Sequence, residues 1–255
     1  MRGVLLAGLI SAFALFGGQS AYAAGGAADV PDQDWQHEGV FGSFDRGELQ
    51  RGFQVFQEVC SACHSLQYIA FRNLVEIGFT EEEAKAIAAE YEVEDGPDDE
   101  GEMFDRPARL SDYWPSPFAN DNEARAANGG ALPPDLSLII KAREGGPDYI
   151  YALMTGYEEE APEGMDLSDG MSFNHFFPGQ QIAMVEPLYD EAVEYVDGTP
   201  MTLEQHARDV TAFLSWTAEP ELEERKETGL KVLIFVFVLT AVLFVIYRRV
   251  WAKLH

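Results

Sequence analysis

Apolar residues recur at helical spacing in several separate stretches of this chain. Ser43 or Asp45 can cap a first helix that runs to about Cys60, and Thr80-Glu81-Glu82-Glu83 is a capping box that opens a second. Residues 93–131 and 156–200 lack this period and contain many glycines and prolines, so we expect irregular loops there. No stretch alternates long enough for a sustained strand, and the predicted fold class is mainly α. Three later helices are expected over 133–143, 147–156 and 202–219.

The two ends of the chain carry apolar runs of a different kind. Residues 1–23 combine a basic start, an apolar run and a small-residue cleavage site, as in a secretory signal peptide, with an uncleaved anchor as the alternative. Residues 232–247 are uncharged, and the flanking Lys231 and Trp251 extend them to membrane-spanning length. We therefore expect an exported domain over 24–228, one transmembrane helix over 229–250 and a cytoplasmic tail over 251–255.

The two cysteines of the chain both lie in Val59-Cys60-Ser61-Ala62-Cys63-His64. This C-x-x-C-H spacing is the attachment signature of a c-type haem, in which two thiols bond to the porphyrin edge and the histidine becomes the proximal iron ligand. A redox dithiol would call for a β-α-β pattern around it, and a zinc site would call for a second ligand pair. The sequence contains neither, so we expect one covalently attached haem c.

A haem that only transfers electrons takes a second axial ligand, commonly a methionine sulfur. Met184 ends an aromatic segment rich in proline and glycine, which can fold over a haem face and hold a thioether against the iron. His175, just before that segment, is the rival. An open sixth position is the third possibility, and would suit a peroxidase-like or gas-binding enzyme. The remaining candidates are Met103, Met154, Met165, Met171, Met201 and His206, of which Met154 and His206 lie inside predicted helices.

The formal net charge of −27 adds information on partners. Carboxylates gather over 90–105 and 158–169, and neither run contains Lys or Arg. Such a chain is not expected to bind nucleic acid or anionic lipid, whereas a basic protein partner fits it. Plain solvated loops are the alternative explanation for either run.

Further runs of residues accompany the haem motif: Asp95-Gly96-Pro97, Gly101-Glu102-Met103-Phe104, Arg125-Ala126-Ala127-Asn128, Ala131-Leu132-Pro133-Pro134-Asp135-Leu136-Ser137, Phe177-Pro178-Gly179-Gln180 and Trp216-Thr217-Ala218-Glu219-Pro220. With them the chain resembles the cytochrome c1 family, the haem subunit of the quinol:cytochrome c reductase (cytochrome bc1) complex, in its alphaproteobacterial type. The resemblance covers almost the whole mature chain. It implies a class I cytochrome c-like haem domain with long loop insertions and one C-terminal transmembrane helix.

The same resemblance implies roles for individual residues. Some bacterial members carry an extra cysteine pair before the ligand methionine; since this chain has none, we expect packing alone to hold that loop. The implied haem contacts are thioether bonds at Cys60 and Cys63, axial ligation by His64 and Met184, packing by Pro134, a propionate partner at Arg143 and a further contact at Tyr149.

The implied function is one-electron transfer from the Rieske iron-sulfur protein to a cytochrome c. The expected partners are cytochrome b and the Rieske protein, in a dimeric complex of the bacterial inner membrane with the haem domain in the periplasm. The acidic runs could steer a basic cytochrome c. The alternative is a self-sufficient membrane-anchored electron shuttle, which would need only about half of the exported chain.

Overall fold

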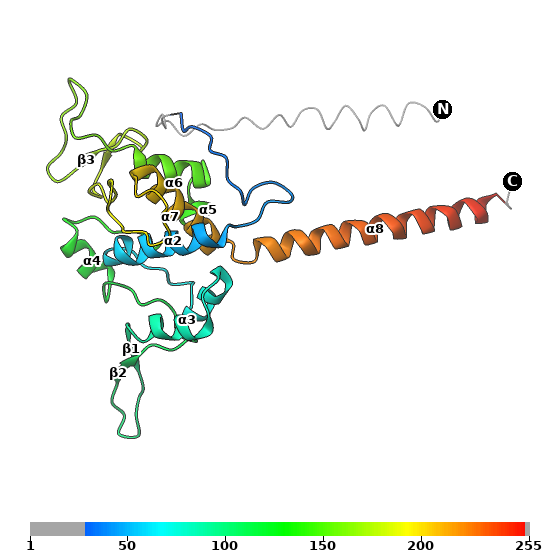
Figure 1. Cartoon of the computed structure of the whole chain (residues 1–255), viewed down its shortest axis with the longest axis horizontal. Helices are drawn as coiled ribbons and strands as arrows, with labels where there is room; N and C mark the ends of the chain where they lie inside the picture. The colour runs from blue at the N-terminus through cyan, green and yellow to red at the C-terminus, as the bar shows by residue number, and fades with distance from the viewer. Residues whose placement is uncertain (1–28, 253–255) are drawn as a thin grey trace, which may run out of the picture.

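The structure, a computed structural model, describes residues 29–252 and consists of a mainly helical domain from which one long helix extends (Figure 1). The expected signal peptide over 1–23 lies outside the described residues. In chain order the elements are α2 (Arg46–Glu58), η2 (Cys60–Ala62), η3 (Phe71–Ile77), α3 (Glu81–Ala88), β1 (Glu92–Asp95), β2 (Phe104–Pro107), α4 (Asp121–Ala127), α5 (Ile139–Ala142), α6 (Gly146–Thr155), β3 (Ser172–Phe173), β4 (Gln181–Ile182), α7 (Leu203–Ala218) and α8 (Leu222–Trp251).

The packing of α2 across α7 forms the centre of the domain. Asp45 caps α2, because its side chain accepts a hydrogen bond from the backbone N–H of Glu48. The two helices meet at Gly52, where an added Cβ would lie 2.0 Å from the carbonyl oxygen of Asp209. The fully buried carboxylate of Asp209 pairs with Arg51, with Nε and Oδ2 3.0 Å apart. This close crossing places the end of α2, and with it the C-x-x-C-H motif, on a rigid base.

Aromatic side chains fill the space between α2, α7 and the segment that follows the motif. The ring of Trp114 lies 4.8 Å from that of Phe71 and 5.6 Å from that of Phe53, measured between centroids. Phe53 in turn contacts Phe213 of α7, with 5.8 Å between the ring centroids. Tilted and edge-on contacts at these distances are favourable, so the rings join the motif segment to the helical core.

Two predictions of irregular structure are wrong in part. Within 93–131 the structure contains α4 and an antiparallel hairpin of β1 with β2, in which Val93 pairs with Arg106. The guanidinium of Arg106 bridges Asp95 on the facing strand and Asp112. Because both strands are largely exposed and charged, they lack the alternation that identifies a strand in sequence. Within 156–200, the short strands β3 and β4 pair in the same antiparallel way.

The helix expected over 133–143 is also wrong for most of its length, because α5 covers only Ile139–Ala142. Pro134 disfavours helical backbone at the residue before it. Asp135 then accepts a hydrogen bond from the backbone N–H of Ser137, an arrangement typical of a turn. The predicted helices that correspond to α2, α3, α6 and α7 are confirmed.

Helix α8 is the one helix within residues 29–252 that is long and apolar enough to cross a membrane. It has 30 residues, and its most apolar window has a mean hydropathy of 2.8 with none of it buried. Its first turns are attached to the domain: Glu223 accepts a hydrogen bond from the backbone N–H of Phe44, and Nζ of Lys226 donates to the carbonyl oxygens of His37 and Gly42. The helix therefore leaves the domain in a fixed direction.

Candidate haem site

Both thiols lie at the end of α2, on a short 3-10 turn. Cys60 is partly buried, Cys63 is exposed, and neither forms a disulfide. Burial, with a smaller contribution from the neighbouring Cys63, raises the pKa of the Cys60 thiol to about 12. A reactive redox dithiol has the opposite property, a thiol pKa lowered by its surroundings. The site therefore disfavours the redox-dithiol interpretation.

The imidazole of His64 is oriented by one hydrogen bond. Its Nδ1 lies 2.8 Å from the carbonyl oxygen of Pro134. A carbonyl can only accept, so Nδ1 carries the proton and Nε2 of the neutral ring has a free lone pair. Burial lowers the pKa of His64, although the bond to Pro134 and the charge of Asp135 oppose the shift. A neutral imidazole whose other nitrogen donates to a backbone carbonyl is the form in which histidine binds a metal.

Asp135 attaches the segment that carries Pro134 to the haem motif. Its Oδ2 accepts hydrogen bonds from Oγ of Ser65 at 2.7 Å and from the backbone N–H of Gln67 at 2.8 Å. The backbone N–H of Leu136 also donates to the carbonyl oxygen of Ser65. These bonds cross about 70 residues of sequence, and they hold the Pro134 carbonyl against His64.

Met184 follows a hairpin that is held by hydrogen bonds. Asn174, fully buried, donates from Nδ2 to the carbonyl oxygen of Leu153 in α6, and its Oδ1 accepts from the backbone N–H groups of Phe176 and Phe177. The hydroxyl of Tyr157 donates to the carbonyl oxygen of Met184 itself at 3.1 Å. The expectation that packing alone holds this loop is therefore wrong, because it overlooked the hydrogen-bond partners that α6 and Tyr157 supply.

The two candidate axial residues of this region differ in exposure. Met184 is partly buried and packs against the core, whereas the side chain of His175 is exposed and its ring lies against that of Phe176. The axial ligand of a buried haem iron has to be shielded from solvent. This difference in exposure therefore favours Met184 over His175.

Arg143 and Tyr149 lie near each other at the start of α6. Arg143 is exposed, and its guanidinium makes one hydrogen bond, to the carbonyl oxygen of Ala142. Tyr149 is buried; burial raises the pKa of its phenol, and the positive charge of Arg143 partly offsets the shift. None of the salt bridges within the described residues involves Arg143, so its charge is available for an anionic group such as a propionate.

The residues present fit a covalently held haem. Two free thiols are followed by a histidine whose Nε2 can bind iron, and Met184 supplies a partly buried thioether. Within residues 29–252 no cluster of three or more His, Cys, Asp and Glu side chains suits another metal ion. The zinc alternative therefore has no support from the described part of the chain.

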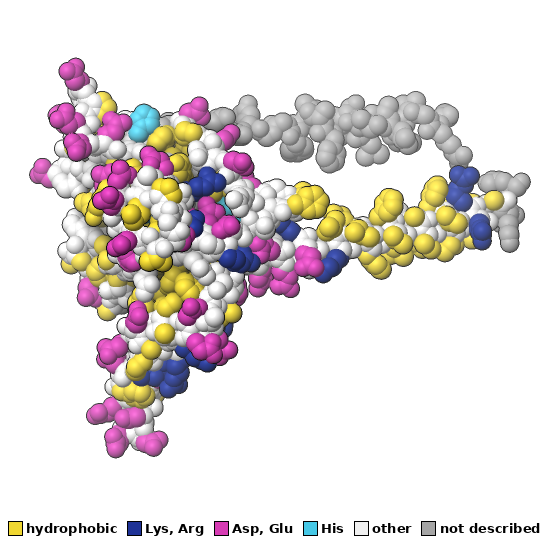
Figure 2. Space-filling view, viewed as in Figure 1, with side chains coloured by type: hydrophobic (Ala, Val, Ile, Leu, Met, Phe, Trp, Pro, Cys, Tyr) yellow, Lys and Arg dark blue, Asp and Glu magenta, His cyan; other side chains and the backbone are white. Residues whose placement is uncertain are grey.

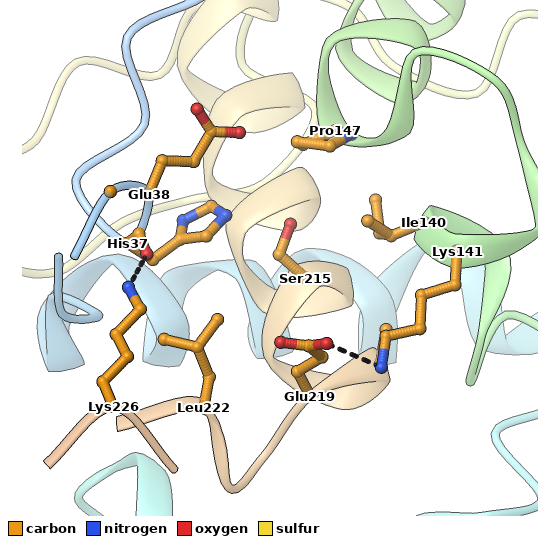
Figure 3. Close-up of a pocket in the computed structure, with 11 residues that line it drawn as sticks. His37, Glu38, Ile140, Lys141, Pro147, Ser215, Glu219, Leu222 and Lys226 are labelled. Carbon is orange, nitrogen blue, oxygen red and sulfur yellow. Dashed lines mark hydrogen bonds and ion pairs between the residues drawn. The ribbon is translucent and has the colours of Figure 1, made fainter. Parts of the chain in front are cut away.

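A pocket of about 300 Å³ lies elsewhere, at the junction of the domain with α8 (Figure 3). His37 and Lys226 line one side of it, and the ion pair of Lys141 with Glu219 lines the other. None of the predicted haem contacts lines this pocket. It is therefore separate from the candidate haem site.

The acidic runs lie on two projections of the domain. Figure 2 shows carboxylates at the tip of the β1–β2 hairpin and on the loop that precedes β3, both well away from α8. All six carboxylates of residues 158–169 are exposed. Arg106 pairs with Asp95 at the base of the hairpin, whereas the carboxylates of 158–169 have no salt bridge within the described residues and produce a negative potential over this part of the surface.

Sequence reasoning missed three residues that position the candidate ligands: Asp135, Tyr157 and Asn174. Asp135 had a detectable signal, because an Asp after Pro-Pro is typical of a turn. Tyr157 and Asn174 had none, because each acts through a backbone carbonyl that only the tertiary structure brings near.

The motif segment and the apolar helix α8 define a c-type haem protein with one candidate membrane-spanning helix among residues 29–252. The family model described as Cytochrome C1 family matches residues 35–254, and the chain belongs to that family. "Cytochrome c1" of Rhodospirillum rubrum is 48% identical over 98% of this chain and 96% of its own length. "Cytochrome b-c1 complex catalytic subunit, mitochondrial" of Candida albicans is 51% identical over 91% of this chain and 82% of its own. "Cytochrome b/c1" of Bradyrhizobium diazoefficiens is 47% identical over 97% of this chain, which spans only 39% of that longer protein.

Proposed function

We propose that this chain passes single electrons from a Rieske iron-sulfur protein to a cytochrome c within a quinol:cytochrome c reductase complex. The observation that carries the proposal is the hydrogen bond from His64 Nδ1 to the Pro134 carbonyl oxygen, beside two free thiols in a member of the cytochrome C1 family. A haem c at this site supplies an iron that gains and loses one electron.

In this proposal the residues of the chain hold the cofactor and set its properties. Cys60 and Cys63 would hold the haem through thioether bonds, and His64, through Nε2, and Met184 would be its iron ligands. Because methionine sulfur raises the reduction potential of a haem, this ligand pair suits an acceptor of electrons from a Rieske centre. Two protein ligands leave no position for a substrate, which supports electron transfer over peroxidase-like or gas-binding chemistry.

The contacts with the haem periphery are assigned in the same way. Pro134 packs beside the ring that His64 approaches, Arg143 pairs with a propionate, and Tyr149 makes a further contact. The exposed guanidinium of Arg143, free of carboxylate partners among the described residues, supports its assignment.

We also propose that the chain assembles with cytochrome b and the Rieske protein in a dimeric complex. Two relatives support this by name, one as a b-c1 complex subunit and one as "Cytochrome b/c1". The haem domain then lies in the periplasm of a bacterial inner membrane, with the C-terminus of α8 in the cytoplasm. Extraction in mild detergent should recover this chain with b-type haems, seen in a reduced-minus-oxidised spectrum. A c-type signal alone would favour the self-sufficient shuttle.

The acidic projections have a role in this function: they attract a basic cytochrome c and speed its encounter. The rate of cytochrome c reduction should then fall as ionic strength rises. Replacing the exposed pair Asp99 and Glu100 with Asn and Gln should lower that rate several-fold at low salt and leave it unchanged at high salt. A matched control neutralises two exposed carboxylates outside the acidic runs, Glu82 and Glu224. Equal effects of both double variants, or a rate independent of salt, would contradict steering.

A further inference from the structure

An exposed apolar loop lies beside the first turns of α8. The loop comprises residues 36–43, and its tip presents Val40 and Phe41, which are 72% and 84% exposed. Single exposed apolar side chains are common on soluble domains, but an adjacent pair at the tip of a tightly closed loop is not explained by chance exposure.

The loop is closed at its base rather than loosely extended. The backbone N–H of Ser43 donates to the carbonyl oxygen of Gln36 at 3.1 Å. At Gly42 an added Cβ would lie 1.8 Å from the carbonyl oxygen of Glu38, so only glycine allows the chain to turn so sharply. The ring of His37 stacks on that of Phe44, with 4.8 Å between centroids. The base of the loop therefore holds the two apolar side chains of the tip in a fixed position.

The loop is also attached to α8 near the apolar part of that helix. Nζ of Lys226 donates to the carbonyl oxygens of His37 at 2.6 Å and of Gly42 at 2.9 Å, one on each side of the tip. Lys226 precedes Val232, where the uncharged run begins, by six residues, or about 9 Å at 1.5 Å per helical residue. The interfacial layer on each side of a bilayer is about 5–8 Å thick. Figure 1 shows the dark-blue loop segment on the side of the domain from which α8 extends.

We propose that Val40 and Phe41 enter the interfacial layer of the membrane that α8 spans, as a second contact between the domain and the bilayer. An aromatic ring is well suited to this layer, where one end of a side chain can contact acyl chains. Together with the two bonds from Lys226, this contact fixes the tilt and rotation of the domain about α8. We assign lipid as the partner of Val40 and Phe41, because α8 enters the bilayer within two helical turns of the loop.

Site-directed spin labelling of the full chain tests this proposal. Phe41→Cys, Val196→Cys and Val238→Cys variants are labelled with a nitroxide and reconstituted into nanodiscs of phosphatidylcholine with a minor fraction of phosphatidylglycerol. Frequent collision of the nitroxide with oxygen indicates that the label lies in lipid. Frequent collision with a water-soluble nickel complex indicates that it lies in solvent. Val196, fully exposed on the domain, is the aqueous control, and Val238 in α8 is the bilayer control. All three labelled positions are exposed, and substitutions at such positions usually change stability little, so folding should not confound the comparison.

The label at position 41 should show an oxygen-to-nickel accessibility ratio several-fold above that at position 196 and below that at position 238. A ratio equal to that at position 196 would overturn the proposal. Low accessibility to both reagents in the complex extracted from membranes would also overturn it, because a protein subunit would then cover the tip.

The labelling scheme rests on the proposed function, because it assumes that Cys60 and Cys63 are consumed by thioether bonds. The parent chain without an added cysteine should therefore take up no label. Labelling of that parent would count against the haem attachment, independently of where residue 41 lies. Nickel accessibility at position 238 would count against the membrane span.

Discussion

The Nδ1 nitrogen of His64 lies 2.8 Å from the carbonyl oxygen of Pro134, and this contact joins two sequence motifs that are 70 residues apart. The first motif provides the thiols and the imidazole, and the second provides the acceptor that orients the imidazole. A histidine fixed in this way presents the same nitrogen to a metal at all times. The Pro-Pro-Asp run therefore belongs to the candidate haem site through its contact with His64.

Replacing Asp135 with alanine should loosen this contact. The change removes an acceptor shared by the Ser65 hydroxyl and the backbone N–H groups of Gln67 and Ser137. Since a charged hydrogen bond contributes about 1.5–3 kcal/mol and Asp135 is only partly buried, we expect the free energy of unfolding to fall by at least about 3 kcal/mol. Chemical denaturation of the full chain in detergent measures this change.

The matched control for that variant is Asp105→Ala, at an exposed position on β2. It should change the free energy of unfolding by less than about 0.5 kcal/mol. The Asp135 variant should also shift the haem absorption bands, because the orientation of His64 is no longer fixed. Unchanged spectra and stability would show that the Pro134 carbonyl is held without Asp135.

Replacing Met184 with leucine should remove the second axial ligand. Because axial ligands set haem potentials over about 0.8 V, we expect the midpoint potential to fall by on the order of 100 mV or more. The reduced protein should then bind carbon monoxide. Redox titration followed by absorbance measures both effects, with Met103→Leu, at an exposed position, as the control. A normal potential in the Met184 variant, with a lowered one in His175→Ala, would reassign the ligand.

Replacing Gly52 with alanine should destabilise the domain by separating α2 from α7. The new Cβ would lie 2.0 Å from the Asp209 carbonyl oxygen and 2.7 Å from the Cβ of Phe213, so the helices have to move apart. Overpacking of this kind costs about 1–3 kcal/mol. Gly47→Ala, in the same helix with flexible side chains as its nearest neighbours, should be neutral or slightly stabilising. Thermal melts of both variants distinguish the crossing from a general effect of alanine.

His37 should make the stability of the domain depend on pH. Burial, followed by the charges of Lys226 and Arg208, lowers the pKa of its imidazole from 6.5 to about 4, with Glu219 opposing the shift. The unfolded chain therefore binds a proton at a higher pH than the folded one. The stabilisation is complete above pH 6.5 and is lost as pH falls toward 4, with about 2 kcal/mol lost at pH 5.

The variant His37→Phe keeps an aromatic ring against Phe44 and removes the titration. Its free energy of unfolding should fall less between pH 7 and pH 5 than that of the unmodified chain. Chemical denaturation at these two pH values measures this change. An equal fall in the free energy of unfolding in both chains would exclude His37 as the origin of the pH dependence.

The sequence was sufficient for the parts of the fold that have a local signal. Asp45, Thr80 and Thr202 cap their helices through short-range hydrogen bonds, and each helix start was predictable from these residues. The haem motif and the apolar run of α8 are equally local. The resemblance to the cytochrome C1 family is confirmed by the family match.

The remaining features depend on contacts between distant segments. Proline and aspartate at 133–135 form a turn bonded to Ser65 and Gln67, whereas in the sequence the same residues were interpreted as the start of a helix. The β1–β2 strands pair in antiparallel register, and a salt bridge from Arg106 of β2 to Asp95 of β1 crosses them, but most of their residues are charged and exposed. The support of Met184 by Tyr157 joins residues 27 positions apart through a backbone carbonyl, and no sequence pattern reports such a bond.

The central claim is that a porphyrin is covalently bound at Cys60 and Cys63. Extraction of the purified full chain with acidified acetone tests it most directly, because the solvent removes a haem held only by its iron ligands. We predict that the pigment stays with the polypeptide in the unmodified chain. Release of the pigment into the acetone would contradict the claim.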